Sequence, residues 1–529
     1  MEGDINQELL SKSAEAEVTV ADHEVSLKKK VWSETKKLWV VAGPAIVTRF
    51  TTFGINVISQ AFIGHIGAAE LAAYSFVYTV LLRFSSGVLM KYLKWIFSIH
   101  GQKYCEMEAA ERNRNENTKA RITQLILGMA SALETLCGQA YGAKQYNMLG
   151  VYLQRSWIVL FFTSIFLLPL LIFTTPILKI LGQEENIADI GGDVGHWFIA
   201  VLFSLIPSFT CQMFLQAQSK NVIITYLAAF SIAIHLLLSW LLTVKYKFGI
   251  PGAMFSTVLA YWIPNIGQLA FVMCGGCRQT WKGFSSLAFK ELWPVIKLSV
   301  SSGVMLCLEI CYNTGLLILA GFMKNAEVSI DALSICLNIN GLEMMISLGF
   351  LAAASVRVSN ELGRGDSKAA KFSIMNTVLT SFVIGFALFL VFLFVRGRIA
   401  YIFTDSQEVV EAVASLSPLL AVSILLNSIQ PVLSGVAVGA GWQSTVAYVN
   451  IACYYLVGIP VGAVLGYLFN MGIKGVWVGM LFGTFVQTVV LVVITYRTDW
   501  DEQVILAHKR VKRWGAEDGK EGKRAASDV

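Results

Sequence analysis

Long apolar runs separated by short polar turns dominate the pattern of this chain. Most runs extend over about 20 residues or more, enough for an α-helix to cross a hydrocarbon core of roughly 30 Å. Reading them against Gly, Pro and charged turn residues predicts twelve spans: 38–62, 69–94, 147–173, 194–217, 221–244, 250–274, 292–321, 330–356, 370–395, 412–437, 444–468 and 473–495. An even number of spans places both termini on the same side of the membrane.

The first six spans resemble the last six when the two groups are aligned. Leu38-Trp39 opens the first span and matches Leu292-Trp293 at the start of the seventh, an offset of 254 residues. Two later matches, 138–142 with 359–363 and 249–252 with 472–475, have offsets of 221 and 223. We therefore predict an all-α polytopic membrane protein with twelve transmembrane helices in two six-helix lobes related by an internal repeat.

The fall in the offset means that the first half contains about 33 extra residues between the first two matches. A polar insert at about 91–126 explains the difference, because its run of charged residues, 102–121, cannot lie in lipid. It interrupts the second span. The segment is either a lineage-specific loop or the result of a misplaced exon boundary or retained intron, and we favour the second interpretation.

The composition agrees with a membrane protein and orients it. The 529 residues are 55% hydrophobic and 14% charged, against roughly 25% charged in soluble domains. Basic residues are concentrated before the first span, between the sixth and seventh spans, and after the last span. The positive-inside rule predicts that these three basic segments lie in the cytosol. The predicted parts are a cytosolic N-terminal tail (1–37), an N-lobe (38–274), a cytosolic interlobe linker (275–291), a C-lobe (292–496) and a cytosolic C-terminal tail (497–529).

Several classes of function find no support in the sequence. The basic residues do not interleave with aromatic residues on a soluble surface, so we expect no nucleic-acid partner. The nine cysteines are scattered, and Cys274-Gly-Gly-Cys277 lacks the second pair or nearby His that a zinc site needs. Zinc-protease and serine-hydrolase motifs are absent from the sequence. We expect neither a metal, nor a cofactor, nor an enzyme.

One acidic residue, Glu309, lies near the middle of the seventh span, between Lys297 and Lys324. A charge at that depth costs about 2.5–3.5 kcal/mol on insertion scales, so it rarely occurs without a role or a partner. Burial disfavours the ionised form of a carboxyl group. Glu309 is therefore a candidate for proton coupling, and its alternative role is an interhelical hydrogen bond.

Other polar residues in the C-lobe spans are candidates for the lining of a substrate cavity. They comprise amide and hydroxyl groups of the seventh, eighth and tenth spans: Tyr312, Asn313, Asn338, Asn340, Asn427 and Gln430. Such residues also form ordinary contacts between membrane helices. The first span has no carboxylate at the position that corresponds to Glu309.

Four segments give the chain a specific resemblance: 133–143 (LETLCGQAYGA), 214–219 (FLQAQS), 357–363 (RVSNELG) and 433–443 (LSGVAVGAGWQ). With them, residues 30–500 apart from the insert resemble the plant DETOXIFICATION branch of the multidrug and toxic compound extrusion (MATE) family, near its flavonoid and tannin-precursor transporters. The resemblance implies two V-shaped lobes, alternating access and export of organic solutes in exchange for protons. It also implies that Glu309 is the proton-coupling residue. Many plant relatives pair this acid with an Asp in the tenth span, where this chain has Asn427, so we expect a single strong titratable group in the C-lobe.

The sequence therefore predicts a proton-coupled antiporter of xenobiotics, phenolic conjugates or organic cations. We expect a monomer whose partners are a small organic substrate, protons and the lipid bilayer. The expected location is the vacuolar membrane, with the plasma membrane as the alternative. The alternative functions are a passive anion channel or uniporter on the same scaffold and a lipid flippase.

Overall fold

The computed structural model describes residues 2–77, 122–180, 182–290, 292–321, 326–402 and 406–515. Within these ranges the chain is helical and contains no β-strand. Ten of the helices described are long and apolar enough to cross a membrane. The predicted second span and the insert at 91–126 lie mostly outside the described residues, so the choice between a loop and a splicing error stays open.

The N-lobe consists of the helices that precede the linker. Their bounds are α1 Glu2–Ile66, α2 Ala68–Phe76, α4 Ile122–Gly142, α5 Tyr146–Ile172, α6 Thr174–Ile180, α7 Glu185–Ala217, α8 Val222–Ser239 with the π-helix η3 Trp240–Lys245, and α9 Gly249–Phe271 with the π-helix η4 Val272–Gly276. Helix α1 begins far before the predicted span because no proline interrupts residues 2–37.

The C-lobe follows the linker, which contains the short 3₁₀ helix η5 Ser286–Phe289. Its elements are α10 Leu292–Gly321, α11 Ala326–Arg364, α12 Ser367–Val395, η6 Arg396–Ile402, α13 Gln407–Asn427, α14 Gln430–Ala440, α15 Gln443–Asn450, η7 Ile451–Gly458, α16 Ile459–Ala463, η8 Val464–Leu468 and α17 Gly472–Arg497. A last helix, α18, covers Trp500–Gly515.

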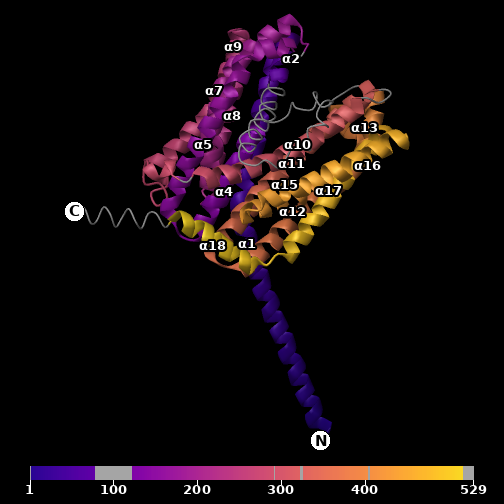
Figure 1. The fold of residues 1–529 in the computed structure, drawn as a ribbon. Coiled ribbons are helices and arrows are strands. Elements are labelled where there is room, and N and C mark those ends of the chain that lie inside the picture. The colour runs from indigo at the N-terminus through magenta and orange to yellow at the C-terminus, as the bar shows by residue number, and fades with distance from the viewer. Residues whose placement is uncertain are drawn as a thin grey trace, which may run out of the picture.

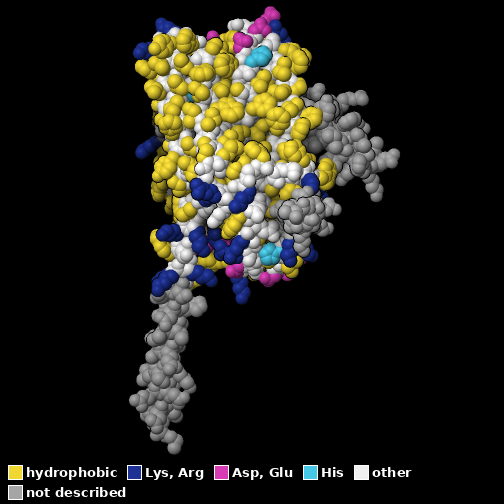
Figure 2. All heavy atoms as spheres, turned by 90° about the vertical axis from the view of Figure 1, so that its left-hand side faces the viewer, with side chains coloured by type: hydrophobic (Ala, Val, Ile, Leu, Met, Phe, Trp, Pro, Cys, Tyr) yellow, Lys and Arg dark blue, Asp and Glu magenta, His cyan; other side chains and the backbone are white. Residues whose placement is uncertain are grey.

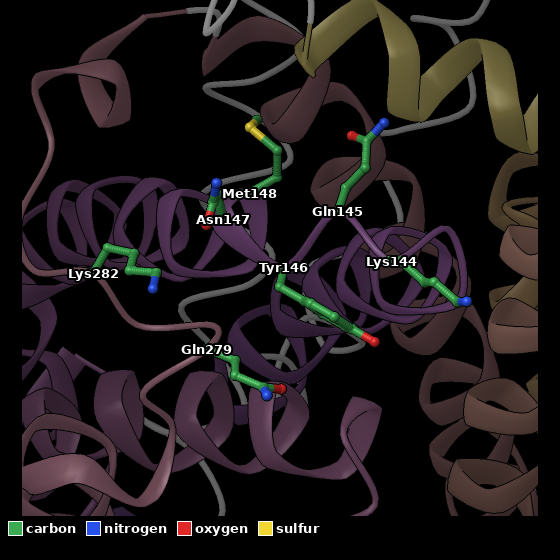
Figure 3. Close-up of a pocket in the computed structure, with 7 residues that line it drawn as sticks. All are labelled: Lys144, Gln145, Tyr146, Asn147, Met148, Gln279 and Lys282. Carbon is green, nitrogen blue, oxygen red and sulfur yellow. The ribbon is translucent and has the colours of Figure 1, made fainter.

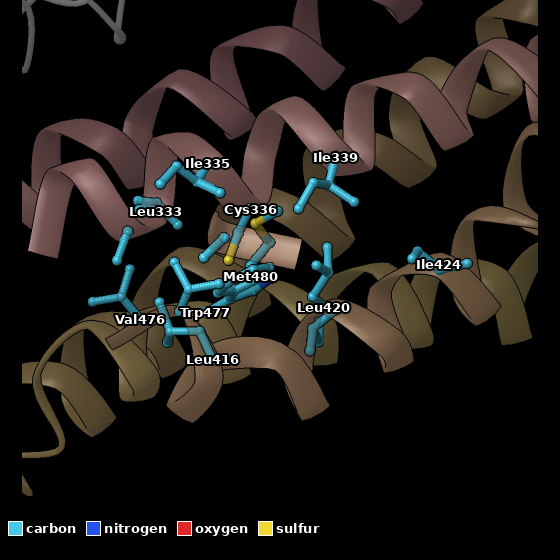
Figure 4. Close-up of a cluster of buried hydrophobic side chains, with 14 of the residues drawn as sticks. Leu333, Ile335, Cys336, Ile339, Leu416, Leu420, Ile424, Val476, Trp477 and Met480 are labelled. Carbon is cyan, nitrogen blue, oxygen red and sulfur yellow. The ribbon is translucent and has the colours of Figure 1, made fainter. Parts of the chain in front are cut away.

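The helices confirm the predicted fold class. The predicted third to twelfth spans each coincide with a helix or a run of consecutive helices, and the helices extend beyond the apolar runs by up to about ten residues. Such extensions are expected because a helix continues into the headgroup region after its apolar part has ended. Each lobe buries its own core. In the C-lobe, side chains of α11, α13 and α17 interdigitate around Trp477 (Figure 4).

Figure 1 shows the two lobes converging near α18 and diverging toward the ends marked by α9 and α13. Figure 2 shows a broad hydrophobic surface over the helices, with Lys and Arg side chains gathered at the end from which the N-terminal part of α1 emerges. This is the end for which the positive-inside rule predicts a cytosolic position. The lobes are therefore joined at the basic end and separated at the opposite end.

Unusual backbone conformations recur at the repeat offset and confirm the internal repeat. Left-handed residues occupy matching turns of the two lobes, 221 to 223 positions apart: Lys144 (φ 60°) and Gly365 (φ 92°), Ser219 (φ 57°) and Gly441 (φ 82°), Lys247 (φ 54°) and Asn470 (φ 51°). Non-glycine residues adopt this conformation rarely. Its recurrence at these positions shows that the two lobes share their turns as well as their helices.

Helices α4 and α11 cross at the junction of the lobes through two glycines that are equivalent in the repeat. A Cβ atom on Gly142 would collide with the backbone carbonyl of Asn360, and one on Gly363 would collide with that of Gln139. Gln139 and Asn360 are themselves repeat equivalents. The contact is therefore nearly two-fold symmetric, and it depends on the absence of side chains at both glycines.

We expect Gly363→Ala to destabilise the protein by about 1–3 kcal/mol, because the added methyl group meets backbone atoms that cannot move aside. Gly341→Ala is the matched control on the same helix, since a Cβ atom there would meet nothing within 4 Å. The control should be neutral or slightly stabilising. Thermal unfolding of both purified variants measures the difference, and equal unfolding temperatures would contradict the proposed crossing.

Helix α18 lies across the basic end and attaches to the C-lobe. His508 Nε2 lies 2.9 Å from the carbonyl oxygen of Gly363, and Arg510 donates to the carbonyl of Ala440 at 2.8 Å. Burial lowers the pKa of the Arg510 guanidinium, which still keeps its charge at neutral pH. Trp500 is buried and packs against Trp442 with ring centroids 5.3 Å apart.

Candidate functional site

Glu309 lies on α10, a helix of 30 residues. Its side chain is half-buried and lies close enough to Tyr454 of η7 for the two groups to interact electrostatically. In the described part of the chain, no hydrogen bond or ion pair involves its carboxylate. An unpaired carboxyl group at membrane depth is available to bind a proton or a cationic substrate.

An aromatic and amide network lies beside Glu309. Tyr312 stacks on Tyr454 with ring centroids 4.2 Å apart and planes 9° from parallel. The Tyr454 hydroxyl donates to Gln487 at 2.6 Å, and Gln487 donates to Asn450 at 2.6 Å. Tyr454 belongs to η7, a π-helical segment, and such segments are frequent at functional sites. Proton binding at Glu309 would thus occur beside an ordered hydrogen-bond chain.

A second buried carboxylate, Glu343, lies on α11 and is 5% exposed. One of its oxygens accepts from Ser347 at 2.6 Å, and the other accepts from Asn427 of α13 at 3.4 Å. Asn340 accepts from both Asn427 and Ser423 at 3.0 Å. The expectation of a single titratable group in the C-lobe is therefore wrong. Asn427 of the tenth span contacts a second carboxylate, that of Glu343.

The tenth span is broken directly after Asn427. Helix α13 ends at this residue and α14 begins at Gln430, with Pro431 in its first turn. The Ser428 carbonyl at the break accepts from the Ser381 hydroxyl at 2.6 Å. A broken helix inside a membrane protein is tolerated where neighbouring groups satisfy its backbone, and it gives the helix a point at which to bend.

The structure brings only some of the predicted cavity residues together. Asn340 and Asn427 share a hydrogen bond beside Glu343, whereas Tyr312 is buried and donates to the Met480 carbonyl at 2.9 Å. Gln430 donates to Ser434 of its own helix at 3.2 Å, and Asn338 is exposed. The side chain of Asn313 lies outside the described residues.

Sequence reasoning missed two buried acids that the same signal could have found. Glu343 lies near the middle of the predicted eighth span, as Glu309 does in the seventh. Glu134, 1% exposed on α4, lies against Arg49 of α1 and Ser355 of α11. Glu134 lies outside the predicted spans, because the first residues of α4 were assigned to the polar insert and its remaining apolar run was too short to be predicted as a span. Glu134 and Ser355 are repeat equivalents, so this contact lies near the axis that relates the lobes.

We expect Asn427→Asp to broaden the dependence of transport on pH. The new carboxylate would lie within hydrogen-bonding distance of Glu343, and two interacting acids release their protons as a pair. The pH profile and the thermal stability should be measured on the same preparation, so that destabilisation by the added acid is recognised. An unchanged profile at unchanged stability would show that the Glu343 cluster takes no part in coupling.

An ion-pair network joins the two lobes at the basic end. Arg357 of α11 contacts Glu34 of α1 at 2.7 Å and Glu361 of its own helix at 2.6 Å. Glu361 also contacts Arg364 at 3.1 Å. The side chains of Arg357 and Glu34 are each 9% exposed. A partly buried pair of this kind resists separation of the lobes, because separation would leave the charge of Arg357 with fewer partners.

The described residues contain no group of three or more His, Cys, Asp or Glu side chains that could bind a metal ion. The polar groups around Glu309 and Glu343 are carboxylates, amides and hydroxyls. This set can bind protons or organic groups with hydrogen-bond donors.

Comparisons with known proteins agree with this geometry. The MatE family model matches residues 118–241 and 302–464. Protein DETOXIFICATION 21 of Arabidopsis thaliana is 59% identical over 526 residues, which cover 99% of each chain. Protein DETOXIFICATION 27 of the same organism is 47% identical and covers 92% of this chain and 93% of its own. The crystal structure of the eukaryotic MATE transporter AtDTX14 superposes with a TM-score of 0.76 at 31% identity, over 91% of this chain and 99% of that chain.

Proposed function

This chain belongs to the MATE family of membrane transporters, and from that premise we propose that it is a proton-coupled antiporter of organic solutes. The transported class would be xenobiotics, phenolic conjugates such as flavonoid glycosides, or organic cations. Substrate would move from the cytosol to the opposite side of the membrane in exchange for protons.

The observation that supports this proposal most is the pair of acids at membrane depth in the C-lobe. Glu309 has no hydrogen-bond or ion-pair partner in the described part of the chain, and Glu343 has only hydroxyl and amide partners. Neither acid is neutralised by a basic residue within the described ranges. A proton can therefore compete with a substrate for these groups, which is the requirement for exchange.

The proposed transport cycle is alternating access by movement of the two lobes. In the structure the lobes meet at the basic end and diverge at the other (Figure 1). Proton binding from the far side would neutralise the C-lobe acids and weaken their hold on a bound substrate. Opening toward the cytosol would then require separation of the contacts between α1 and α11.

We propose the vacuolar membrane as the location, with the plasma membrane as the alternative. The orientation is the same in both cases, because the basic end faces the cytosol and transport is directed away from it. The proposed unit of transport is the monomer, since each chain contains both lobes.

A passive anion channel on the same scaffold is the alternative function. Anion pathways are lined with basic side chains, whereas the two acids of the C-lobe have no basic partner among the residues described. This observation favours the antiporter.

Uptake into proteoliposomes tests the proposal. A panel of labelled phenolic glycosides and organic cations is offered to vesicles with and without an imposed pH gradient. We expect uptake of at least one class that depends on the gradient and is abolished by a protonophore. A large ion current that follows the membrane potential alone would favour the channel and overturn the antiporter.

A further inference from the structure

A pocket of about 480 Å³ opens at the cytosolic end of the N-lobe, outside the C-lobe groups discussed above (Figure 3). It lies between the start of α5 and the interlobe linker. Its lining residues are Lys144, Gln145, Tyr146, Asn147, Met148, Gln279 and Lys282. The volume lies within the range of small-molecule sites.

The linker side of the pocket is fixed in place by hydrogen bonds from the N-lobe. Gln154 of α5 donates to the Gly283 carbonyl at 2.9 Å and accepts from the Ser285 amide at 2.8 Å. Thr280 donates to Gln218 at 2.8 Å. These bonds flank Gln279 and Lys282, so the backbone of this wall is held in place before any ligand arrives.

The lining is basic and contains no acid. Lys144 and Lys282 are exposed, and neither forms an ion pair with a described residue. The remaining lining side chains include three amides and a phenol, which can donate hydrogen bonds to an anion.

The equivalent surface of the C-lobe has an acid at the start of its helix, which the N-lobe surface lacks. There Asp366, the equivalent of Gln145, accepts from the Ala369 amide at 2.8 Å and so caps the start of α12 with a carboxylate. Gln145 makes no such bond at the start of α5. The start of α12 also contacts a second acid, since Ser367 donates to Asp501 of α18 at 2.6 Å.

The equivalent helices α5 and α12 thus begin among side chains of opposite charge. In the C-lobe, the acids Asp366 and Asp501 lie at the helix start, whereas in the N-lobe the lining of the pocket contains two lysines and no acid. From this contrast we propose that the N-lobe pocket binds a phosphate-bearing anion between Lys144, Lys282 and the first turn of α5. Phosphate suits this combination of ammonium groups, amides and a helix start.

The location of the pocket favours a lipid headgroup as the source of the phosphate. Helix α5 runs from the pocket into the membrane, where Phe161, Phe162 and Phe166 are exposed on its surface. Basic pockets beside transmembrane helices on the cytosolic side bind anionic headgroups. A soluble phosphate ester would use the same contacts, and the experiment separates the two sources.

The test is binding of phosphatidylinositol 4-phosphate by the purified full-length protein, measured as lipid adducts in native mass spectrometry. The double variant Lys144→Ala/Lys282→Ala is compared with Lys368→Ala/Lys371→Ala, which removes two exposed lysines of the C-lobe near the same end of the molecule. Each lysine near an anionic lipid increases the binding constant by about a factor of five. We expect about thirty-fold weaker binding in the pocket variant and near wild-type binding in the control.

Binding of soluble inositol 1,4-bisphosphate to lipid-free protein in detergent shows whether the pocket requires a lipid or only a phosphate group. Binding of the lipid but not of the soluble ester assigns the pocket to a headgroup, whereas equal binding of both assigns it to phosphate in general. Equal binding of the lipid by the two double variants would overturn the proposal. Because binding is measured without transport, this result does not depend on the proposed transport function.

Discussion

Proton-driven uptake should fall to the level of protein-free vesicles when Glu309 is replaced by Gln, while the protein still folds and inserts. Glutamine keeps the shape and most of the hydrogen-bonding capacity of the side chain but cannot gain or lose a proton. Removing a potential charge from membrane depth should not lower stability, since a charge there costs about 2.5–3.5 kcal/mol on insertion scales. Uptake against an imposed pH gradient, on matched amounts of reconstituted protein, measures the effect.

The control for this variant is Glu411→Gln, because Glu411 is an exposed acid near the start of α13. It should transport at the wild-type rate. Exchange of labelled for unlabelled substrate without a pH gradient should survive in Glu309→Gln, since the movement of the lobes does not require that proton. Normal gradient-driven uptake by Glu309→Gln would refute the assignment of the coupling residue.

The second large effect concerns the cytosolic junction of the lobes. Glu34→Gln should shift the protein toward a state that is open to the cytosol, because Arg357 then loses its charged partner across the lobes. Removing one partner of a buried ion pair costs about 3–5 kcal/mol of stability. Because this pair is partly exposed, we expect the cost of Glu34→Gln to be at or below the lower end of that range. Hydrogen exchange of the peptides at the cytosolic ends of α1 and α11 should become faster.

The molecule offers a matched control for this experiment as well. Glu361 is the other partner of Arg357, at 2.6 Å, but it lies on the same helix as the arginine. Glu361→Gln therefore disturbs the same guanidinium without removing a contact between the lobes. If both variants exchange hydrogen equally fast at the end of α1, the ion pair with Glu34 does not control the junction.

The membrane spans could be predicted closely because lipid imposes a simple rule. A spanning segment must be apolar for about 20 residues, and the predicted seventh span, 292–321, has the same bounds as α10. This rule did not predict α4, because the polar insert lies between the predicted second span, 69–94, and the apolar residues of α4. The early start of α1 was also missed, because residues before 38 are polar and carry no apolar signal.

The candidate site was predicted only in part, because contacts between helices depend on rotations that hydropathy does not determine. The sequence identified Asn427 and Asn340 but not their contact with Glu343, 84 residues from Asn427 along the chain. It grouped Tyr312 with the cavity residues, whereas its hydroxyl is bound to a backbone carbonyl of α17. Hydropathy identifies a charged residue at membrane depth, but it does not determine which side chains an amide group will contact.

The most direct test of the central claim is the movement of protons driven by substrate. Proteoliposomes are loaded with a transported substrate and a pH-sensitive dye, with equal pH on both sides and the membrane potential clamped at zero. Outward movement of substrate should draw protons into the lumen and acidify it, and Glu309→Gln should abolish the signal. Substrate movement of undiminished rate with no change of luminal pH would contradict proton-coupled exchange.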